Sequence, residues 1–418
     1  MNKKSVLTLC AAVALLVPAQ LFASGFGYYE HGAKATAVAG AFVAQADDAS
    51  AIYYNPAGIA FLEGTSIYGA IHPVKPSSTA RIFGTTTDTE TGWQPPSSAF
   101  VATNLTSAVK FGVGVFIPYG LEVKWPKNWV GSQISQRSYL RSIYIRPTVA
   151  FQASEKLALG IGLDFVTSKV TLEQQTPFSV SPLLPSGRAD AVVEGTGTGY
   201  GFTAGLLFKA SDKVQFGAKY QHEVEIDFEG DVDFTYIAAG HPLVDGFGAA
   251  LFVDQNVKTT ITMPAELVVG VMFKPAENFN FEVDFQWTKW DSYQTLDVQF
   301  DNPLLNIQDE GNWDNSWMIR IGGEYWVAPE WAVRAGYIHD TSPIPDNTVK
   351  PILPDSARNE VTFGLGYDTQ ESCCWGNFRA DFALQYVKSD ERTSTFPAFP
   401  ATYEQDALIF GVGFGITF

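Results

Sequence analysis

The sequence predicts an all-β fold, a transmembrane antiparallel β-barrel of about fourteen strands with an N-terminal segment folded inside its lumen. Three observations predict this class. Aromatic residues make up 14% of the 418 residues and glycine occurs 37 times, whereas charged residues make up only 17%. Long segments alternate apolar and polar side chains. After the N-terminal leader, no segment has the roughly 18 consecutive apolar residues of a spanning helix.

Residues 1–23 are predicted to be a signal peptide that directs the chain out of the cytoplasm. Two lysines begin it, an apolar run follows from Val6 to Val17, and cleavage is expected after Ala23. The mature chain then keeps Cys373 and Cys374. Because adjacent cysteines form only a strained disulfide, a turn with two free thiols is favoured over a redox pair.

Residues 24–63 precede the first expected strand and are rich in glycine and alanine. A short helix is expected over 35–46. A segment of this length ahead of a barrel is expected to fold as a plug inside the lumen. The alternative is a disordered periplasmic tail.

The last strand shows the alternation most clearly. From Leu408 to Phe418 the even positions are large and apolar, and the odd positions are mostly small. Similar alternation elsewhere places charges on the second face, which a barrel lumen accommodates. The same pattern predicts strands over 64–72, 97–105, 109–121, 139–152, 157–173, 198–209, 213–229, 256–273, 278–298, 315–327, 331–341, 359–369, 378–389 and 406–418, and the barrel proper over 64–418.

The connections between these strands alternate in length, as in bacterial barrels, where periplasmic turns are short and outer loops are long. The long ones are 74–96, 122–138, 174–197, 230–255, 299–314, 342–358 and 390–405. Tryptophans near strand ends are expected to form girdles at the membrane interfaces. They are Trp287, Trp290, Trp317, Trp326, Trp331 and Trp375.

Polar positions of the strands supply the charges that are expected to face the lumen. They are Arg146, Asp164, Lys219, Glu223, Glu225, Glu282, Asp284, Arg320, Glu324, Arg334, Arg379 and Asp381. Salt bridging between plug and wall is favoured for them over a transport role. The net charge of −17 argues against nucleic acid as a partner.

Several passages resemble the FadL family of outer-membrane transporters for long-chain fatty acids. The first is Asp47-Asp48-Ala49 followed by Tyr54 and the Asn55-Pro56-Ala57 hatch motif. The others are residues 285–291, 331–337, 340–343 and 353–358, in the same order. The resemblance covers essentially the whole mature chain.

The resemblance implies a fourteen-stranded barrel with an N-terminal hatch. It implies uptake of hydrophobic small molecules through an outer loop groove, a lumenal pocket and a lateral opening in the wall. Long-chain fatty acids are the expected substrate. Uptake of aromatic or aliphatic hydrocarbons, or general porin activity, is the alternative.

Two outer loops carry apolar side chains that are expected to form the outer groove. They are Phe178, Val180, Leu183 and Leu184 in one loop and Ile237, Leu243, Val244 and Phe247 in the other. The alternative is that these side chains pack on each other and cap the barrel.

Strand three contains Pro118-Tyr119-Gly120, and the resemblance implies a kink there that opens the wall. The alternative is a plain bulge. In strand five the apolar face changes phase, so a bulge is expected near Val166 that would turn Lys169 inward. The resemblance then implies that Lys169 anchors a carboxylate head group. Arg320 is the positive charge closest to the family's second anchor.

No hydrolase elbow and no metal-ligand spacing is found, and the five histidines are scattered, so no enzyme, cofactor or metal is expected. The expected partners are a hydrophobic ligand, outer-membrane lipid and lipopolysaccharide, and the barrel-assembly machinery, which would recognise Phe418. A monomer in the outer membrane of a Gram-negative bacterium is expected. Two alternatives remain: a diffusion porin, which would conduct ions, and an adhesin, whose loops would bind cells.

Overall fold

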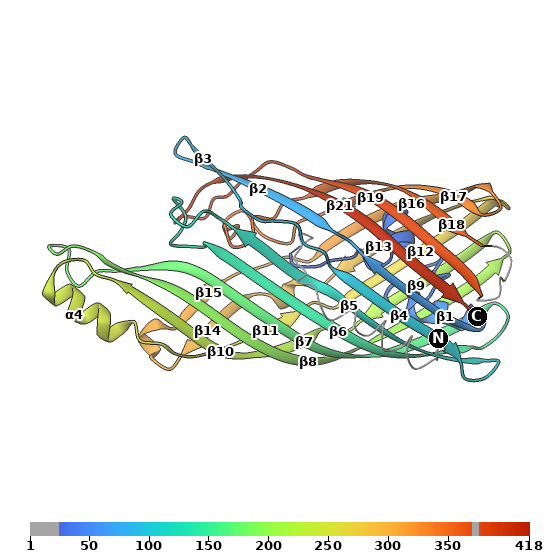
Figure 1. Cartoon of the computed structure of the whole chain (residues 1–418), viewed down its shortest axis with the longest axis horizontal. Coiled ribbons are helices and arrows are strands. Elements are labelled where there is room, and N and C mark those ends of the chain that lie inside the picture. Colours follow the sequence, from blue (N-terminus) through green and yellow to red (C-terminus); the bar gives the residue numbers. More distant parts are fainter. Residues whose placement is uncertain (1–24, 370–375) are drawn as a thin grey trace.

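The computed structural model describes residues 25–369 and 376–418 and shows a closed antiparallel barrel of 14 wall strands (Figure 1). The predicted signal peptide, Cys373, Cys374 and Trp375 lie outside the described residues. Within the described ranges, no helix has the length and apolarity that crossing a membrane requires.

Ten of the fourteen wall strands are continuous, and each of the other four consists of two consecutive β-strands. In chain order the wall comprises β1 (Thr65–Ile71) with β2 (Val74–Ile82), β4 (Ser97–Asn104), β5 (Val109–Lys124), β6 (Arg137–Gln152), β7 (Leu157–Phe178), β8 (Gly187–Ser211), β9 (Val214–Gln221) with β10 (Val224–Ile237), β11 (Gln255–Met263) with β12 (Glu266–Ala276), β13 (Phe279–Thr288) with β14 (Thr295–Phe300), β16 (Ser316–Ala328), β17 (Trp331–Asp340), β18 (Arg358–Asp368), β19 (Asn377–Ser389) and β21 (Thr402–Thr417). Shorter elements outside the wall are β3 (Thr85–Asp88), α4 (Pro242–Leu251), η2 (Trp290–Ser292), η3 (Pro303–Leu305), β15 (Ile307–Glu310) and β20 (Arg392–Thr393).

The first and last wall strands close the barrel. Ile67 of β1 lies opposite Ile416 of β21 on one side and opposite Val101 of β4 on the other. Alternate side chains of β21 face outward, as the period of two predicts, and Phe414 is 57% exposed. A wall whose outer side is apolar and whose inner side is polar suits a membrane, because closure pairs every wall strand.

The predicted strand number is confirmed, but several predicted loops contain strands or helices. β2 lies within the loop expected over 74–96. β7 and β8 continue through most of the loop expected over 174–197, with their register unbroken from Leu157 to Phe178. These two strands and β10 extend the wall well beyond its other strands, and α4 lies at the far end (Figure 1).

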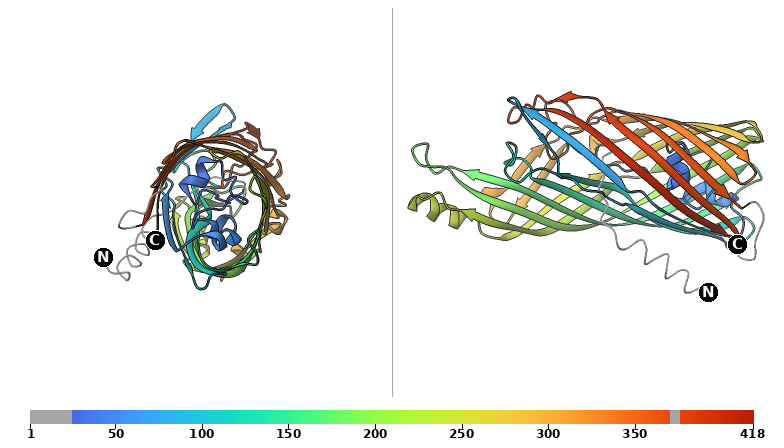
Figure 2. Two further views of the ribbon diagram at one scale, coloured as in Figure 1. Left: turned by 90° about the vertical axis from the view of Figure 1, so that its right-hand side faces the viewer. Right: turned by 45° about the horizontal axis from the view of Figure 1, so that its top comes forward.

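Residues 25–64 lie inside the barrel, where Figure 2 shows their short helices enclosed by the wall. The segment comprises α2 (Ala33–Ala37), α3 (Ala51–Tyr54) and the 3-10 helix η1 (Pro56–Phe61). We call it the hatch. The helix predicted over 35–46 is wrong, because the chain turns after Ala37 through left-handed backbone at Ala39 (φ 60°) and Gly40 (φ 68°).

The bulge predicted near Val166 is also wrong. β7 pairs with β8 without a register shift, and Val166 and Ser168 point to the lumen while Phe165 and Lys169 point outward. The phase of the wall changes in another strand, between β9 and β10. Thr203 of β8 lies opposite Gln221, but Thr198 lies opposite Asp227, so the second strand holds one extra residue.

This extra residue reverses the faces of β10. Lys219 of β9 is buried inside the barrel, whereas Val224 and Ile226 of β10 take over the inner face. Glu223 and Glu225 are therefore not lumenal, as the continuous alternation predicted, and lie on the outer side. A register change of one residue moves every later side chain to the opposite face.

Candidate functional site

Two carboxylates of β13 hold the hatch against the wall. Asp284 accepts hydrogen bonds from the amides of Phe42 (3.0 Å) and Val43 (3.1 Å). Glu282 accepts from the amides of Ala44 (2.6 Å) and Gln45 (2.7 Å). Because the side chains at positions 282 and 284 project from one face of a strand, they meet four successive hatch amides. Hydrogen bonds to a charged acceptor are stronger than neutral ones.

Most of the other predicted lumenal charges pair with each other or with the hatch. Arg146 meets Asp164 at 2.6 Å, and both side chains are fully buried. Arg334 meets Glu324 at 2.6 Å and Asp381 at 2.7 Å. Such buried pairs leave little uncompensated charge in the lumen, in line with the structural role favoured for them.

Asn55 of the predicted hatch motif joins three parts of the molecule. Its Nδ2 donates to the carbonyl of Val43 (2.7 Å) and to that of Leu206 on β8 (3.0 Å). Its Oδ1 accepts from the amide of Ala57 (3.1 Å) and so caps η1, with Pro56 at the first helical position. The motif therefore links two parts of the hatch to each other and to the wall.

Arg320 of β16 lies in the centre of the lumen and is 4% exposed. Its guanidinium lies over the ring of Tyr29, 4.9 Å from the centroid, and its Nε has no hydrogen-bond partner. Among the described residues, no carboxylate lies within ion-pair distance of it. A buried cation without a direct counter-ion is costly, so the site favours an anionic group brought by a ligand.

Lys219 of β9 shares a small lumenal cavity with Arg320. Hatch and wall line this cavity, which is about 10 Å³ and is too small for a ligand in this conformation. The Lys219 ammonium meets Glu266 at 3.3 Å and the ring of Tyr53 at 4.8 Å. Any ligand head group between the two cations has to displace part of the hatch.

Lys169 does not join this pair. It lies outside the barrel, 41% exposed, and its Nζ meets Glu194 of β8 at 3.2 Å. Because the head-group role predicted for Lys169 depended on the absent bulge, we do not propose it further.

An aromatic cluster surrounds the first residues of the hatch. The ring of Phe26 lies 5.0 Å from Trp290, 5.6 Å from Tyr293 and 5.2 Å from Trp313. The prediction that Trp290 belongs to an interfacial girdle is wrong, because it is fully buried inside the wall. Its Nε1 has no hydrogen-bond partner. The sequence pattern did not identify this cluster, because η2 interrupts the strand at that point.

The wall is irregular at Pro118 and Gly120. The register between β5 and β6 shifts between Phe116 and Tyr119, and β4 pairs with β5 only as far as Val115. Beyond that point the hatch replaces the neighbouring strand. Tyr28 donates its amide to the Pro118 carbonyl (2.7 Å), and Gly120 donates its amide to the carbonyl of Phe26 (2.9 Å).

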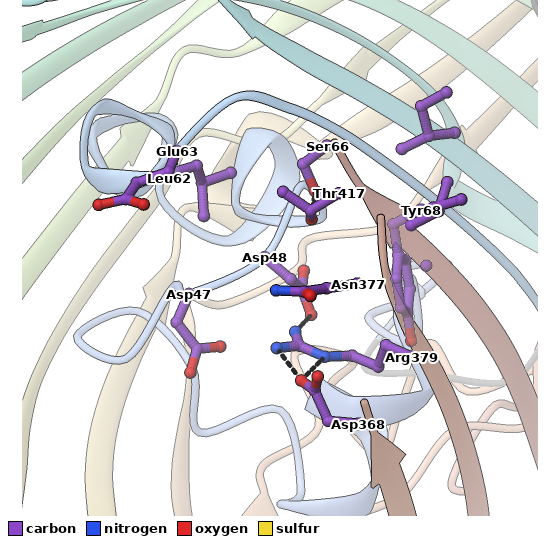
Figure 3. A pocket seen from close by; sticks show the side chains of 13 residues that line it. Asp47, Asp48, Leu62, Glu63, Ser66, Tyr68, Asp368, Asn377, Arg379 and Thr417 are labelled. Atoms are coloured by element: carbon purple, nitrogen blue, oxygen red, sulfur yellow. Dashed lines mark hydrogen bonds and ion pairs between the residues drawn. The ribbon is translucent and has the colours of Figure 1, made fainter. Parts of the chain in front are cut away.

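A second cavity of about 120 Å³ lies where the hatch meets the wall at the end that carries the C-terminus (Figure 3). Asp47 and Asp48 of the hatch line it, together with Arg379 and Asp368 of the wall. Arg379 meets Asp368 at 2.9 Å and Asp48 at 3.6 Å. Burial raises the pKa of Asp48 above its ordinary value, although Arg379 opposes the shift. Charged side chains therefore form part of the lining at this end.

The predicted groove residues meet at the tip of the outer extension, around α4. Phe178 packs against Phe247 at 5.9 Å and Phe252 at 5.3 Å, and Val244 is fully buried. Others remain exposed, among them Leu243 (68%) and Leu183 (94%). Ile237 and Leu184 are half-buried. The tip thus combines a small core of its own with an exposed apolar surface.

A closed barrel with an apolar outer side and a hatch pinned inside defines a membrane-spanning channel protein of the bacterial outer membrane. The family described as outer membrane protein transport protein (OMPP1/FadL/TodX) matches residues 14–418. The chain belongs to this family, whose members transport hydrophobic compounds.

Relatives match most or all of the chain at low identity. The long-chain fatty acid transport protein of Escherichia coli O6:H1 (strain CFT073) is 24% identical over 458 residues, covering 100% of both chains. The 47 kDa outer membrane protein of Pasteurella multocida is 22% identical and covers 73% of each chain.

Two solved structures share the fold. A FadL homologue of Pseudomonas aeruginosa superimposes with a TM-score of 0.84 at 17% identity, covering 94% of this chain and 100% of its own. The toluene transporter TodX of Pseudomonas putida gives a TM-score of 0.72 at 18% identity, covering 95% and 100%.

Proposed function

We propose that this protein carries long-chain fatty acids across the outer membrane and releases them sideways through the wall beside Pro118. Substrate meets the exposed apolar side chains at the outer tip first. It then moves into the lumen, where its chain contacts apolar side chains and its carboxylate lies between Arg320 and Lys219. It leaves between β5 and the strands before it.

One observation carries this proposal: hatch residues replace a wall strand beside β5. Most wall strands pair through ladders, but beyond Val115 β5 is bonded on that side to residues 26–28 of the hatch and, at Lys124, to the loop residues Glu90 and Thr91. When these few residues move, the wall opens without breaking a strand–strand ladder. An apolar molecule that leaves there enters lipid without crossing water.

The polar cavity at the other end supports a lateral exit over an axial one. A hydrophobic molecule that left along the barrel axis would pass Asp47, Asp48 and Arg379 (Figure 3). Apolar surface gains nothing from such charged groups. The lateral route avoids both this junction and the aqueous periplasm.

The choice of fatty acids follows from Arg320. Its guanidinium is buried and lacks a carboxylate partner, and a ligand carboxylate would supply one with two parallel hydrogen bonds. The name of the Escherichia coli relative agrees with this choice of substrate.

Aromatic hydrocarbons are the second candidate, and the cluster around Phe26 favours them. Trp290, Tyr293 and Trp313 already hold one aromatic ring edge-on or tilted, in the geometry that aromatic pairs prefer. A free aromatic molecule would take the position of the Phe26 ring. Uptake of a radiolabelled aromatic hydrocarbon in preference to a fatty acid would establish this candidate.

The test is to straighten β5 with Pro118→Val and Gly120→Val. We expect slower uptake of radiolabelled oleic acid by cells that lack other fatty-acid channels, because an unkinked strand closes the lateral gap. Heat-modifiable gel mobility should show normal assembly. Pro147→Val is the matched control, because Pro147 lies in β6 where the register is unbroken. Unchanged uptake in the double variant would reject lateral exit at this point.

A further inference from the structure

Three neighbouring wall strands are interrupted at one level on another side of the barrel. β9 ends at Gln221 before β10, β11 ends at Met263 before β12, and β13 ends at Thr288 before η2 and β14. The register shows how much chain is inserted. Glu266 lies opposite Thr288, but Lys258 lies opposite Gln299, so the β13–β14 strand holds three extra residues.

The ladder is missing between the two ends of this interruption. β11 pairs with β14 only at Val257 and Lys258. At the lower end, Lys289 donates its amide to the carbonyl of Ala265 (2.9 Å). Between them, among the described residues, the Thr259 hydroxyl donates a cross-strand hydrogen bond to the Asp297 carbonyl (2.8 Å). Pro264 has no amide hydrogen to donate. The wall is therefore closed here by side chains rather than by strand pairing.

Apolar side chains line the inner side of the interruption. Trp290 of η2 and Met263 of β11 are both fully buried. Tyr119 of the β5 irregularity reaches this side too, and its hydroxyl donates to the Pro264 carbonyl at 3.2 Å. The two irregular parts of the wall therefore meet inside the lumen around Phe26.

An exposed ion pair crosses the outer side of the interruption. Lys289 meets Glu223 at 3.4 Å, and the side chains are 41% and 39% exposed. Glu223 and Lys289 belong to the two strands that flank the β11–β12 strand, so the ion pair crosses that strand near Pro264. Next to the ion pair, paired positions of β9, β12 and β16 carry one row of apolar side chains, from Tyr220 through Leu267 to Trp317. Such a row marks the edge of the lipid band. An exposed ion pair contributes little stability, so it opens readily.

We propose that this interruption is a second lateral port for apolar molecules, with η2 as its gate and the Lys289–Glu223 pair as its latch. The inference rests on the proposed function, because it needs hydrophobic molecules in the lumen. Outward movement of η2 withdraws Trp290 and connects the aromatic cluster with surrounding lipid. Opening breaks the Lys289–Glu223 ion pair, the hydrogen bond from the Lys289 amide to Ala265 and the two hydrogen bonds between Asp291 and Asn315. An element held by so few contacts is expected to move more easily than a paired strand. Two ports then act in parallel.

The experiment closes each port separately. Glu223→Cys and Lys289→Cys are combined in a Cys373→Ser, Cys374→Ser background and linked on whole cells with a short, reducible bis-thiol reagent. The matched control is Glu229→Cys with Lys258→Cys. Those two residues form an exposed Lys–Glu pair at 2.7 Å directly opposite each other on the continuous β10–β11 ladder. Uptake of radiolabelled oleyl alcohol is measured before linking, after linking and after reduction.

Linking positions 223 and 289 should lower uptake about twofold when β5 is native, because one of two parallel routes is lost. In the Pro118→Val, Gly120→Val variant it should lower uptake to the level of cells without the protein, and reduction should restore it. The control pair should change neither.

Two results overturn the port. The first is that the β5 variant already shows no uptake, and the second is that linking positions 223 and 289 leaves uptake unchanged. Either result rejects the port, while the proposed function stands. No uptake by the native protein rejects the proposed function itself. Lys289→Glu, which makes the latch repulsive, provides a test without cysteines. It should raise uptake in the β5 variant, and unchanged or lower uptake contradicts the gate.

Discussion

At the scale of single residues, a few buried side chains with defined hydrogen-bond partners determine the packing inside the lumen. Asn55 bonds two carbonyls and one amide, and Arg320 is a buried cation for which the described residues provide no direct counter-ion. These residues differ in what a substitution should change. Asn55 should affect the docking of the hatch, whereas Arg320 should affect the choice of ligand.

Arg320→Gln should weaken binding of a fatty acid about tenfold and hardly change binding of the matching alcohol, because a charged hydrogen bond contributes about 1.5–3 kcal/mol. Tritium-labelled ligands and purified protein in detergent provide the measurement. Lys169→Ala is the control, because this lysine lies outside the barrel and should affect neither ligand. An equal loss for acid and alcohol would remove the anchor role.

Asn55→Ala should loosen the hatch by about 1–3 kcal/mol, because it leaves buried backbone groups without partners. Hydrogen exchange of the segment that contains residues 41–62 should become faster. Asn302→Ala is a close control. Asn302 also precedes a proline and caps a 3-10 helix through the amide of Leu304, but it lies on an exposed outer loop. Unchanged exchange in Asn55→Ala would show that the motif does not fix the hatch.

At the scale of elements, the fit between hatch and wall depends on where the wall lacks side chains. Gly160 of β7 and Gly205 of β8 lie against the hatch motif, and an added Cβ at Gly160 would overlap the backbone of Pro56 and Ala57. The 3-10 turn of the hatch can approach the wall only at such positions.

Gly160→Ala should therefore displace η1 while the barrel still assembles. Limited proteolysis of folded protein in detergent should cut the hatch, and gel mobility should remain heat-modifiable. Gly69→Ala is the control, because an added Cβ there would meet only the Ser98 carbonyl at an ordinary 3.7 Å. A hatch equally resistant in both variants would contradict the proposed close fit.

The sequence predicted strands well where side chains alternate without interruption, as in β21 and β13. It failed where one inserted residue changes the phase. Alternation shows that a strand has two faces, but it does not show at which residue the pairing register changes. The predicted phase change was therefore placed in β7, whereas it lies between β9 and β10. Of the candidate site, an irregularity at Pro118, which the resemblance implied as a kink, and the interior place of Arg320 were predictable. The aromatic cluster was not, because it is built from separate segments that only the folded hatch brings together.

At the scale of the whole molecule, the barrel is a closed wall that is irregular at β5 and between β11 and β14, with a hatch inside its lumen. Carboxylates of β13 bind four hatch amides, and Arg146, which is paired with Asp164 of the wall, donates to the carbonyl of Ile52 in the hatch. We expect a lumen filled in this way to conduct little ion current, unlike the water-filled lumen of a porin.

The most direct measurement is a comparison of hydrophobic uptake and ion conductance for the same preparation. We predict that purified protein speeds the transfer of labelled oleic acid into proteoliposomes while planar bilayers containing it show little steady ion current. Steady, porin-like conductance without faster transfer of the fatty acid would contradict the account.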